Sequence, residues 1–255
     1  MAAYTNYNKL LNNLEELKLN QMRDSLSSYI DMVSKGEKSF TDALYDMTEK
    51  EKQFRRDVRM NTCVKTAGFP FLKRIDDYDF AFQPSLDRKG IEDLLSLRFI
   101  ENNENILLVG SPGVGKTHLA TSIGIEAALH RYSVHFMTCQ HLISQLKIAE
   151  SENRLEKRLK QFSSYRVLII DEIGYLNMDR ESANLFFQLI SLRYEKKTTI
   201  ITTNKTLAKW HEIFSDPVIT NAILDRLLHH SHVINIVGPS YRTKDILEAL
   251  ESDDH

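Results

Sequence analysis

Hydrophobic and polar positions follow two different patterns along this chain, and the change falls near residue 72. Leucines recur at helical spacing from Leu10 to Leu17, so one face of this segment is apolar. A polar break at Lys35–Lys38 follows, and Ser39 is then positioned to cap a second long helix. The pattern predicts a small all-α domain over residues 1–72, joined to the rest of the chain by a linker near residues 68–76.

From residue 73 onward, short apolar runs alternate with helical stretches. The runs that we predict as strands are Ile106–Val109, Val134–Met137, Val167–Ile170, Thr199–Thr202 and Val233–Ile236. Strands that alternate with helices form a parallel sheet that is covered on both faces. We therefore expect a five-stranded α/β domain over residues 73–255, with its ligands at the carboxyl ends of the strands.

The first predicted strand leads directly into a phosphate-binding loop that matches G-x-x-x-x-G-K-[ST] at every fixed position. The loop is Gly110-Ser111-Pro112-Gly113-Val114-Gly115-Lys116-Thr117. Its glycines allow backbone N–H groups to converge on phosphate, and the following helix adds its N-terminal dipole. We expect Lys116 to reach the β- and γ-phosphates of ATP and the Thr117 hydroxyl to bind Mg²⁺. The predicted nucleotide site includes these eight residues, His118 and, further along the chain, Asp171 and Arg242.

The third predicted strand ends in two acids, Asp171 and Glu172. Because that strand is apolar and buried, both acids should emerge near the nucleotide. Asp171 is expected to hold Mg²⁺ through water, and Glu172 to orient and polarise the attacking water. This pairing favours ATP hydrolysis over phosphoryl transfer to a small molecule. The alternative is that the acids only cap a helix.

A further strand lies between the two strands that carry these motifs, as in the branch of P-loop ATPases with an Asp-Glu pair. This arrangement predicts the spatial strand order 5-1-4-3-2. Asn204, which follows the fourth strand, would then lie beside the γ-phosphate and could hold a phosphate oxygen and water. The alternative is that Asn204 caps a helix that begins at Thr206.

An arginine and three histidines precede the last predicted strand. Arg226 is a candidate arginine finger for a neighbouring subunit's γ-phosphate, and a surface ion pair with Asp225 or with a glutamate is the alternative. His229, His230 and His232 invite a metal interpretation. Their spacing fits no standard zinc set, and no cysteine or acid lies close in sequence to complete four ligands. We therefore expect them to surround the start of the strand without a metal.

Two clusters of basic residues are candidates for contacts with DNA phosphates. The first cluster is Lys50, Lys52, Arg55, Arg56 and Arg59, and the second is Lys147, Arg154, Lys157, Arg158, Lys160 and Arg166. Both clusters also contain acids. A solvated helix face with ion pairs between residues i and i+4 is therefore an equal alternative.

The composition restricts the setting in which these motifs act. The net charge of −2 argues against a uniformly basic nucleic-acid-binding surface, although a local basic patch remains compatible with it. No apolar run approaches the length of about 20 residues that spans a bilayer. The N-terminus has no signal pattern, and Cys63 and Cys139 form no motif. We expect a cytoplasmic protein without a membrane partner.

Several stretches together resemble the IstB-type transposition helper ATPases. They are Gly110–Thr117, Leu168–Gly174, Phe186–Glu195, Leu224–Ser231 and Ser240-Tyr241-Arg242. The phosphate loop is generic, whereas the stretches Asp-Glu-Ile-Gly-Tyr-Leu and Leu-Asp-Arg-x-x-His-His-Ser are far more specific. The resemblance covers essentially the whole chain, including Tyr78-Asp79-Phe80.

This resemblance implies an AAA+ ATPase of the DnaC/DnaA-like clade, encoded beside a transposase in an insertion sequence. Such a protein assembles on duplex DNA with ATP, marks a target site and recruits its transposase, and ATP hydrolysis resets it. By the same resemblance, the second basic cluster faces DNA and the N-terminal helices mediate self-assembly or transposase contact. A DnaC-like helicase loader, with a replicative helicase as its partner, is the alternative.

The resemblance also implies a role for each site residue. Lys116, Thr117, Asp171, Glu172 and Asn204 would act on the nucleotide of one protomer. Arg226 would serve as the finger supplied in trans within a homo-oligomer. Arg242 stands where AAA+ relatives carry their sensor-2 arginine, although the full C-terminal helical lid is missing.

Overall fold

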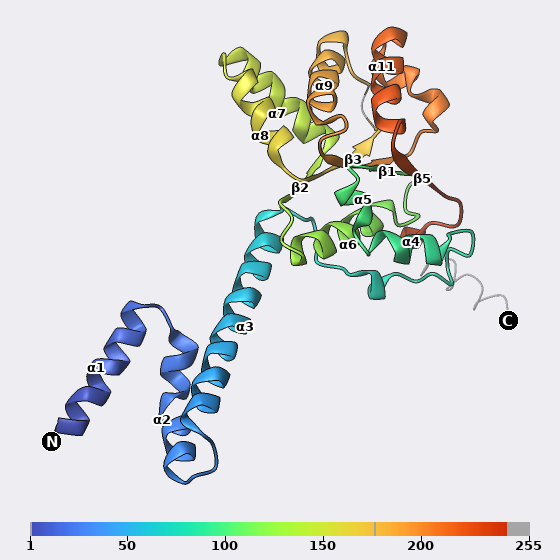
Figure 1. Ribbon diagram of the computed structural model, residues 1–255. Helices are drawn as coiled ribbons and strands as arrows, with labels where there is room; N and C mark the ends of the chain where they lie inside the picture. Colours follow the sequence, from blue (N-terminus) through green and yellow to red (C-terminus); the bar gives the residue numbers. More distant parts are fainter. Residues whose placement is uncertain (1, 176, 244–255) are drawn as a thin grey trace. The chain divides into compact units, whose positions relative to one another are not determined.

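A computed structural model describes residues 2–175 and 177–243 of the chain (Figure 1). The chain divides into two compact units, residues 1–62 and 63–255. The expected absence of a C-terminal lid concerns residues 244–255, which lie outside the described residues. Among the described helices, none is long and apolar enough to cross a membrane.

The first unit is helical. It contains α1 (Ala2–Glu16), α2 (Asn20–Ser34) and most of α3 (Phe40–Thr66). Its small core is made by Leu14, Met22, Leu26, Tyr29, Ala43 and Met47. The hydroxyl of Ser39 accepts a hydrogen bond from the backbone N–H of Asp42 at 3.1 Å, which confirms Ser39 as the cap of the third helix.

The second unit is built on a parallel sheet of five strands over the described residues. The strands are β1 (Asn105–Gly110), β2 (Val134–Thr138), β3 (Val167–Ile173), β4 (Thr198–Thr203) and β5 (Ser231–Ile236). Their order is β2-β3-β4-β1-β5, so the predicted order 5-1-4-3-2 is confirmed. The strand β4 therefore lies between the strand that precedes the phosphate loop and the strand that carries the two acids.

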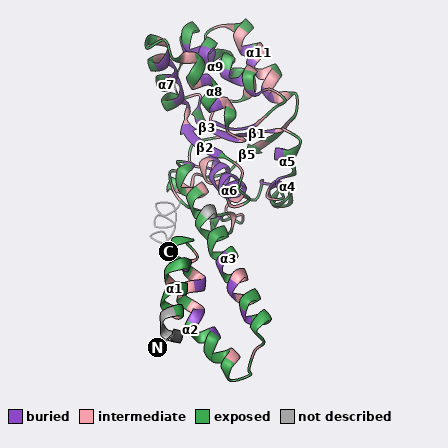
Figure 2. Cartoon of the chain, turned by 60° about the vertical axis from the view of Figure 1, so that its left-hand side comes forward, coloured by how far each residue is buried: buried purple, intermediate pink, exposed green. Residues whose placement is uncertain are grey.

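Helices cover both faces of this sheet (Figure 1). One face carries α4 (Arg88–Leu94), α5 (Arg98–Glu101) and α6 (Lys116–Leu129), and the other carries α7 (Cys139–Ser151), α8 (Leu155–Ser164), α9 (Arg180–Arg193), α10 (His211–Phe214) and α11 (Pro217–Leu228). Two apolar clusters fill the two interfaces between sheet and helices. Figure 2 shows the buried residues concentrated on the strands and the inner sides of these helices.

The division between the units falls earlier than the linker that the sequence predicted. Ala67, just after α3, is fully buried, and its carbonyl accepts a hydrogen bond from the N–H of Phe136 in β2 at 2.7 Å. Cys63 and Val64 pack against the core of the second unit. The last turn of α3 therefore belongs to the α/β unit, because its apolar side chains complete that core.

Three short 3₁₀ turns complete the described structure of the second unit. They are η1 (Ile75–Asp77), η2 (Leu207–Lys209) and η3 (Tyr241–Thr243). The first and the last matter for function, because residues at η1 and η3 line the cavity beside the phosphate loop.

Candidate functional site

The phosphate loop joins the end of β1 to the start of α6. Gly113 and Gly115 have φ values of +84° and +96°, in the left-handed region that favours glycine. A Cβ atom at Gly115 would lie 2.6 Å from Cε2 of Tyr78, so a side chain there would also collide with the wall of the site. The glycines thus permit both the path of the loop and its close contact with neighbouring segments.

The two predicted Mg²⁺ ligands lie together. The hydroxyl of Thr117 is 3.0 and 3.1 Å from the two carboxylate oxygens of Asp171. Asp171 also accepts a hydrogen bond from the hydroxyl of Thr202 in β4. Burial raises the pKa of Asp171, while the hydrogen bonds from Thr202 and Thr117 oppose this rise. One hydroxyl and one carboxylate, both oxygen donors, fit the preference of Mg²⁺.

Lys116 is held over the phosphate loop. Its ammonium donates hydrogen bonds to the carbonyls of Gly110 at 2.8 Å and Ser111 at 2.7 Å, and the residue is only 7% exposed. Burial lowers the pKa of Lys116, and the charge of Arg242 lowers it further, whereas Asp171 opposes the change. A buried cation beside a cavity is a strong site for a phosphate, whose negative charge would compensate it.

Glu172 has an unusual backbone. Its φ is +64°, and the pairing of β3 with β4 shifts between Ile170 and Ile173. Its N–H donates to the hydroxyl of Thr202 at 3.0 Å, which holds this irregularity in place. Residues in such conformations cluster at functional sites, and here the side chain is exposed and lines the cavity.

A cavity of about 400 Å³ lies beside the loop and collects most of the predicted nucleotide site. Its walls include Gly113, Gly115, Lys116, Thr117, His118, Glu172, Thr202 and Arg242. Six further wall residues have no role that the sequence motifs predict, namely Phe71, Lys73, Asp77, Asp79, Tyr175 and Tyr241. All six come from segments that are remote in sequence from the phosphate loop, so only the fold brings them there.

Two tyrosines support the phosphate loop from outside. The hydroxyl of Tyr78 donates to the carbonyl of Val114 at 3.1 Å, and burial raises the pKa of this phenol. The N–H of Tyr241 donates to the carbonyl of Gly113 at 2.9 Å. The two rings also meet edge to face, 5.7 Å apart. The resemblance to a known family singled out both residues, but a function for them emerges only from these contacts.

His118 follows the loop and faces the same wall. Its Nε2 atom lies 3.0 Å from the carbonyl of Arg74, and its ring meets Tyr78 edge to face at 5.3 Å. Burial lowers the pKa of His118. The side chain thus joins α6 to the segment around η1.

Asn204 lies at the carboxyl end of β4. The residue before it, Thr203, is opposite Val109 of β1, which places Asn204 level with the start of the phosphate loop. Its Oδ1 atom is buried and has no hydrogen-bond partner among the described residues. The helix-capping alternative is not supported, because Thr206 occupies the N-cap of the short helix η2. An unpaired buried oxygen invites a donor such as water or a ligand.

Arg226 does not line this cavity. It lies in the last turn of α11, where its guanidinium donates to the carbonyl of Ala222 at 2.9 Å and stacks over the rings of Phe187 at 4.8 Å and Tyr194 at 5.9 Å. Within the described chain, no acid forms an ion pair with it, so the surface-pair alternative with Asp225 is wrong. The residue is partly exposed.

The histidines near β5 have acidic neighbours that the sequence did not reveal. His232 lies 2.8 Å from a carboxylate oxygen of Glu104, and Glu195 lies beside His229 and His230. The absence of a nearby acid in sequence was therefore a poor argument against metal binding, because the loop between α9 and β4 supplies one through the fold.

The second basic cluster lies on α7, α8 and the connections that flank them. Lys147, Arg154 and Lys160 form ion pairs with Asp179, Glu152 and Glu156. Arg154, Lys157 and Arg158 line a hollow of about 220 Å³. Arg166 serves the fold instead, since its guanidinium donates to Asn103 and to the carbonyls of Ile100 and Lys196.

The first basic cluster is partly structural. Arg55 donates to the carboxylate of Glu51 at 2.9 Å and to the carbonyl of Lys18 at 2.9 Å. Glu51 in turn accepts from the N–H of Gln21 at the start of α2. Arg55 and Glu51 therefore tie α3 to the connection between α1 and α2, which is a different use from phosphate binding.

The fold and the phosphate-loop pocket define the chain as a P-loop domain of the AAA+ class. The DnaC helicase loader matches 58% of this chain and 87% of its own chain, with 26% identity and a TM-score of 0.51. DnaA from Aquifex aeolicus, bound to AMPPCP, matches 72% of this chain and 56% of its own, with a TM-score of 0.56. At 19% identity, the second likeness concerns the fold alone.

Within this class, the chain belongs to the family of IstB-like ATP binding proteins, whose profile matches residues 12–249. An ATP-binding protein of insertion sequence IS232 from Bacillus thuringiensis subsp. berliner is 52% identical, covering 94% of this chain and 96% of the relative. The corresponding protein of IS21 from Pseudomonas aeruginosa is 45% identical, covering 91% and 88%. The resemblance that the motifs suggested is confirmed.

Proposed function

We propose that this protein is an ATPase whose nucleotide occupies the cavity beside the phosphate loop. The contact between Thr117 and Asp171 carries this proposal, because it joins the two motifs of the site from separate strands. Lys116 would bind the β- and γ-phosphates, and the loop N–H groups would complete the cradle. Phe71, His118 and Tyr241 are apolar or aromatic wall residues suited to the rest of the nucleotide.

The residues fit Mg²⁺ as a cofactor. Thr117 and Asp171 would hold the ion, directly through the hydroxyl and through water at the carboxylate. When bound, Mg²⁺ neutralises charge on the phosphate oxygens. Glu172, exposed at the cavity wall, would accept a proton from the attacking water and orient it. Asn204 would position that water or a γ-phosphate oxygen, since its buried Oδ1 and its amide offer one acceptor and two donors.

We propose that Arg226 acts on the nucleotide of a neighbouring copy. Its guanidinium lies outside this chain's own cavity, is partly exposed and forms no ion pair with the described residues. An arginine supplied in trans stabilises the charge on the transferring phosphoryl group. Arg242, which lines the cavity, would instead contact the phosphates of its own chain. The active form is then a homo-oligomer.

We propose further that ATP drives this oligomer onto duplex DNA, where it assists a transposase in target selection and strand transfer. Relatives named as insertion-sequence ATP-binding proteins support this role. The hollow lined by Arg154, Lys157 and Arg158 would contact DNA phosphates. The helical first unit, residues 1–62, would mediate self-assembly or transposase contact. Such work places the protein in the cytoplasm.

Sedimentation with duplex DNA, with and without ATP and over a range of salt, tests this proposal. We expect large assemblies only when both ATP and duplex are present. The logarithm of the DNA association constant should fall with the logarithm of salt concentration. In Lys157→Ala this slope should be shallower by about 0.9, the change expected when one DNA phosphate is no longer neutralised. The control Lys89→Ala, an exposed lysine on the opposite face of the sheet, should leave the slope unchanged. A monomer that ignores duplex in both conditions would contradict the proposal.

A helicase loader is the second candidate, favoured by the likeness to the DnaC helicase loader. That likeness covers 58% of this chain, whereas the insertion-sequence relatives match more than 90% of it at higher identity. The two functions share one ATPase site and differ in the partner. Capture of a replicative helicase by the full chain, together with indifference to duplex DNA, would favour the loader.

A further inference from the structure

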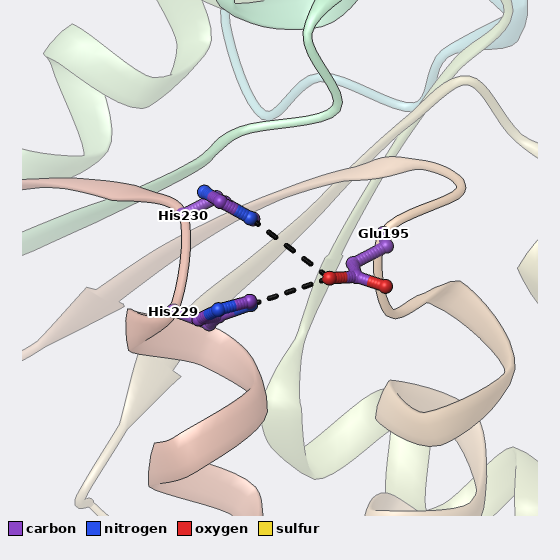
Figure 3. A group of neighbouring side chains, drawn as sticks. All are labelled: Glu195, His229 and His230. Carbon is purple, nitrogen blue, oxygen red and sulfur yellow. Dashed lines mark ion pairs between the residues drawn. The ribbon is translucent and has the colours of Figure 1, made fainter.

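Two histidines and a glutamate meet where α9 and α11 end, away from the phosphate-loop cavity (Figure 3). Each side chain of Glu195, His229 and His230 offers one ligand atom, and these atoms all lie within 4.8 Å of one another. Oε1 of Glu195 is 3.3 Å from Nδ1 of His229 and 3.9 Å from Nε2 of His230. Figure 3 shows both rings approaching the same carboxylate oxygen.

We propose that this trio binds a divalent transition-metal ion of the zinc type. Two imidazoles and one carboxylate are a ligand set that zinc uses in open sites, where water takes the fourth position. Ligand atoms about 2.0–2.2 Å from a tetrahedral ion are roughly 3.4 Å apart. The two distances to Oε1 of Glu195, 3.3 and 3.9 Å, are close to this value, and all three ligand atoms lie within 4.8 Å of one another, so rotation of the side chains can admit an ion.

The surroundings of the trio favour a cation. The helix α9 ends at Arg193 and α11 ends at Leu228, so the carbonyl ends of both helices lie next to the ligands. The C-terminal end of a helix carries partial negative charge and stabilises a nearby cation. The side chains of His229, His230 and Glu195 are 50%, 56% and 51% exposed, which leaves access for an ion and for water.

The backbone already presents the carboxylate in position. Glu195 has a φ of +56°, a left-handed conformation that is uncommon for glutamate. Residues held in this region recur at ligand sites, where the fold compensates for the strain. The site also adjoins Arg226, which precedes His229 in the last turn of α11 and stacks over Tyr194.

A hydrogen bond between Tyr194 and His229 competes with metal binding at His229. The hydroxyl of Tyr194 lies 2.8 Å from Nδ1 of His229, so an ion at that nitrogen must replace this hydrogen bond. Removing the hydroxyl should therefore leave metal binding intact or strengthen it. The rival interpretation is that protonated histidines simply form ion pairs with Glu195, without any metal, and it predicts no specific ion binding.

The test is titration of the untagged, full-length protein, first freed of metal by a chelator, in excess Mg²⁺ to occupy oxygen-rich sites. Calorimetry with Zn²⁺ gives the stoichiometry, and Co²⁺ gives a visible absorption band that reports its ligands. We expect one ion per chain. His229→Ala, His230→Ala and Glu195→Gln should each weaken binding by more than about tenfold.

Three variants serve as matched controls. His232→Ala removes a nearby histidine that pairs with Glu104 instead, and Cys63→Ser removes a partly exposed thiol. Both should bind the ion as the original chain does, and Tyr194→Phe should bind it at least as tightly. The proposal is overturned by an absence of stoichiometric binding, by unchanged binding in the three ligand variants, or by loss of binding in any control.

Discussion

The phosphate-loop cavity and the end of α11 carry the two halves of the proposed ATPase site, and they differ in how complete they are. Lys116 and Thr117 line one cavity, and Asp171, which is buried, contacts the Thr117 hydroxyl at its edge. Arg226 lies outside that cavity and stacks on aromatic rings. Under the proposed function, one chain would build the nucleotide-binding half alone, whereas Arg226 would act on the nucleotide of another copy.

The chemistry of the two halves agrees with this division. Burial shifts the pKa values of Lys116 and Asp171 in the first half. A bound phosphate would compensate the charge of Lys116, and Mg²⁺ would compensate the charge of Asp171. Arg226 has five N–H donors, of which the described contacts engage one, with Ala222. Most of its donors are thus left for a phosphate, and the flat aromatic neighbours hold it without neutralising it.

Lys116→Ala should abolish ATP binding at the phosphate-loop cavity, which is the largest effect that we expect. The variant removes the ammonium that would bind the β- and γ-phosphates, so we expect ATP binding to fall below detection in a fluorescent-nucleotide titration. The thermal stability without nucleotide should stay close to that of the original chain. Normal ATP affinity in this variant would show that the cavity is not the nucleotide site.

Arg226→Ala should impair ATP hydrolysis without impairing ATP binding. We expect ATP affinity to be retained and steady-state phosphate release to fall by about 10³-fold, the usual contribution of an arginine finger. Arg226→Lys should be nearly as poor, because an ammonium lacks the planar fork. If Arg226 only packs on Phe187 and Tyr194, the variants would lose thermal stability while turnover stays normal.

Glu172→Gln should retain ATP binding at the phosphate-loop cavity but lose most ATP hydrolysis. The amide keeps the size of the side chain but cannot take a proton from water, so hydrolysis should fall by about 10²-fold or more. ATP binding should persist, and sedimentation should find the protein trapped in its assembled state. Assemblies that dissociate at the original rate would contradict the role of Glu172.

Tyr78→Phe should give a smaller effect that tests how firmly the loop is held. Loss of the hydrogen bond to the carbonyl of Val114 should lower the free energy of unfolding by about 1–3 kcal/mol. For a domain of this size, each kcal/mol lowers Tm by about 2–4 °C. Differential scanning calorimetry measures this, with Tyr175→Phe as a control at an exposed phenol. An equal loss in both variants would exclude a specific support of the loop.

Sequence patterns predicted most of the fold because the relevant signals are local. The apolar runs gave the five strands, and the position of the strand between the two motifs gave their order. The linker was placed too late because burial of Ala67 depends on a contact with Phe136, which is remote in the sequence. Local pattern carries no information about such a pairing.

In the candidate site, too, local motifs are predictable from the sequence and contacts between distant segments are not. Thr117 and Asp171 were predicted from local motifs to lie together, and their side chains are in contact. The supports from Tyr78 and Tyr241, and the approach of Glu195 to His229, depend on the folding of distant segments. Arg166 was misread for the same reason, since charge and position suggested DNA while three acceptors from the fold bind its guanidinium.

Mixing the Lys116→Ala and Arg226→Ala proteins tests the shared site most directly. Each variant alone should be inactive, because one cannot bind ATP and the other lacks the finger. In mixed oligomers, the Arg226→Ala subunits bind ATP and their Lys116→Ala neighbours supply Arg226, so phosphate release should reappear in proportion to random mixing. A mixture as inactive as its components, with assembly intact, would contradict the account.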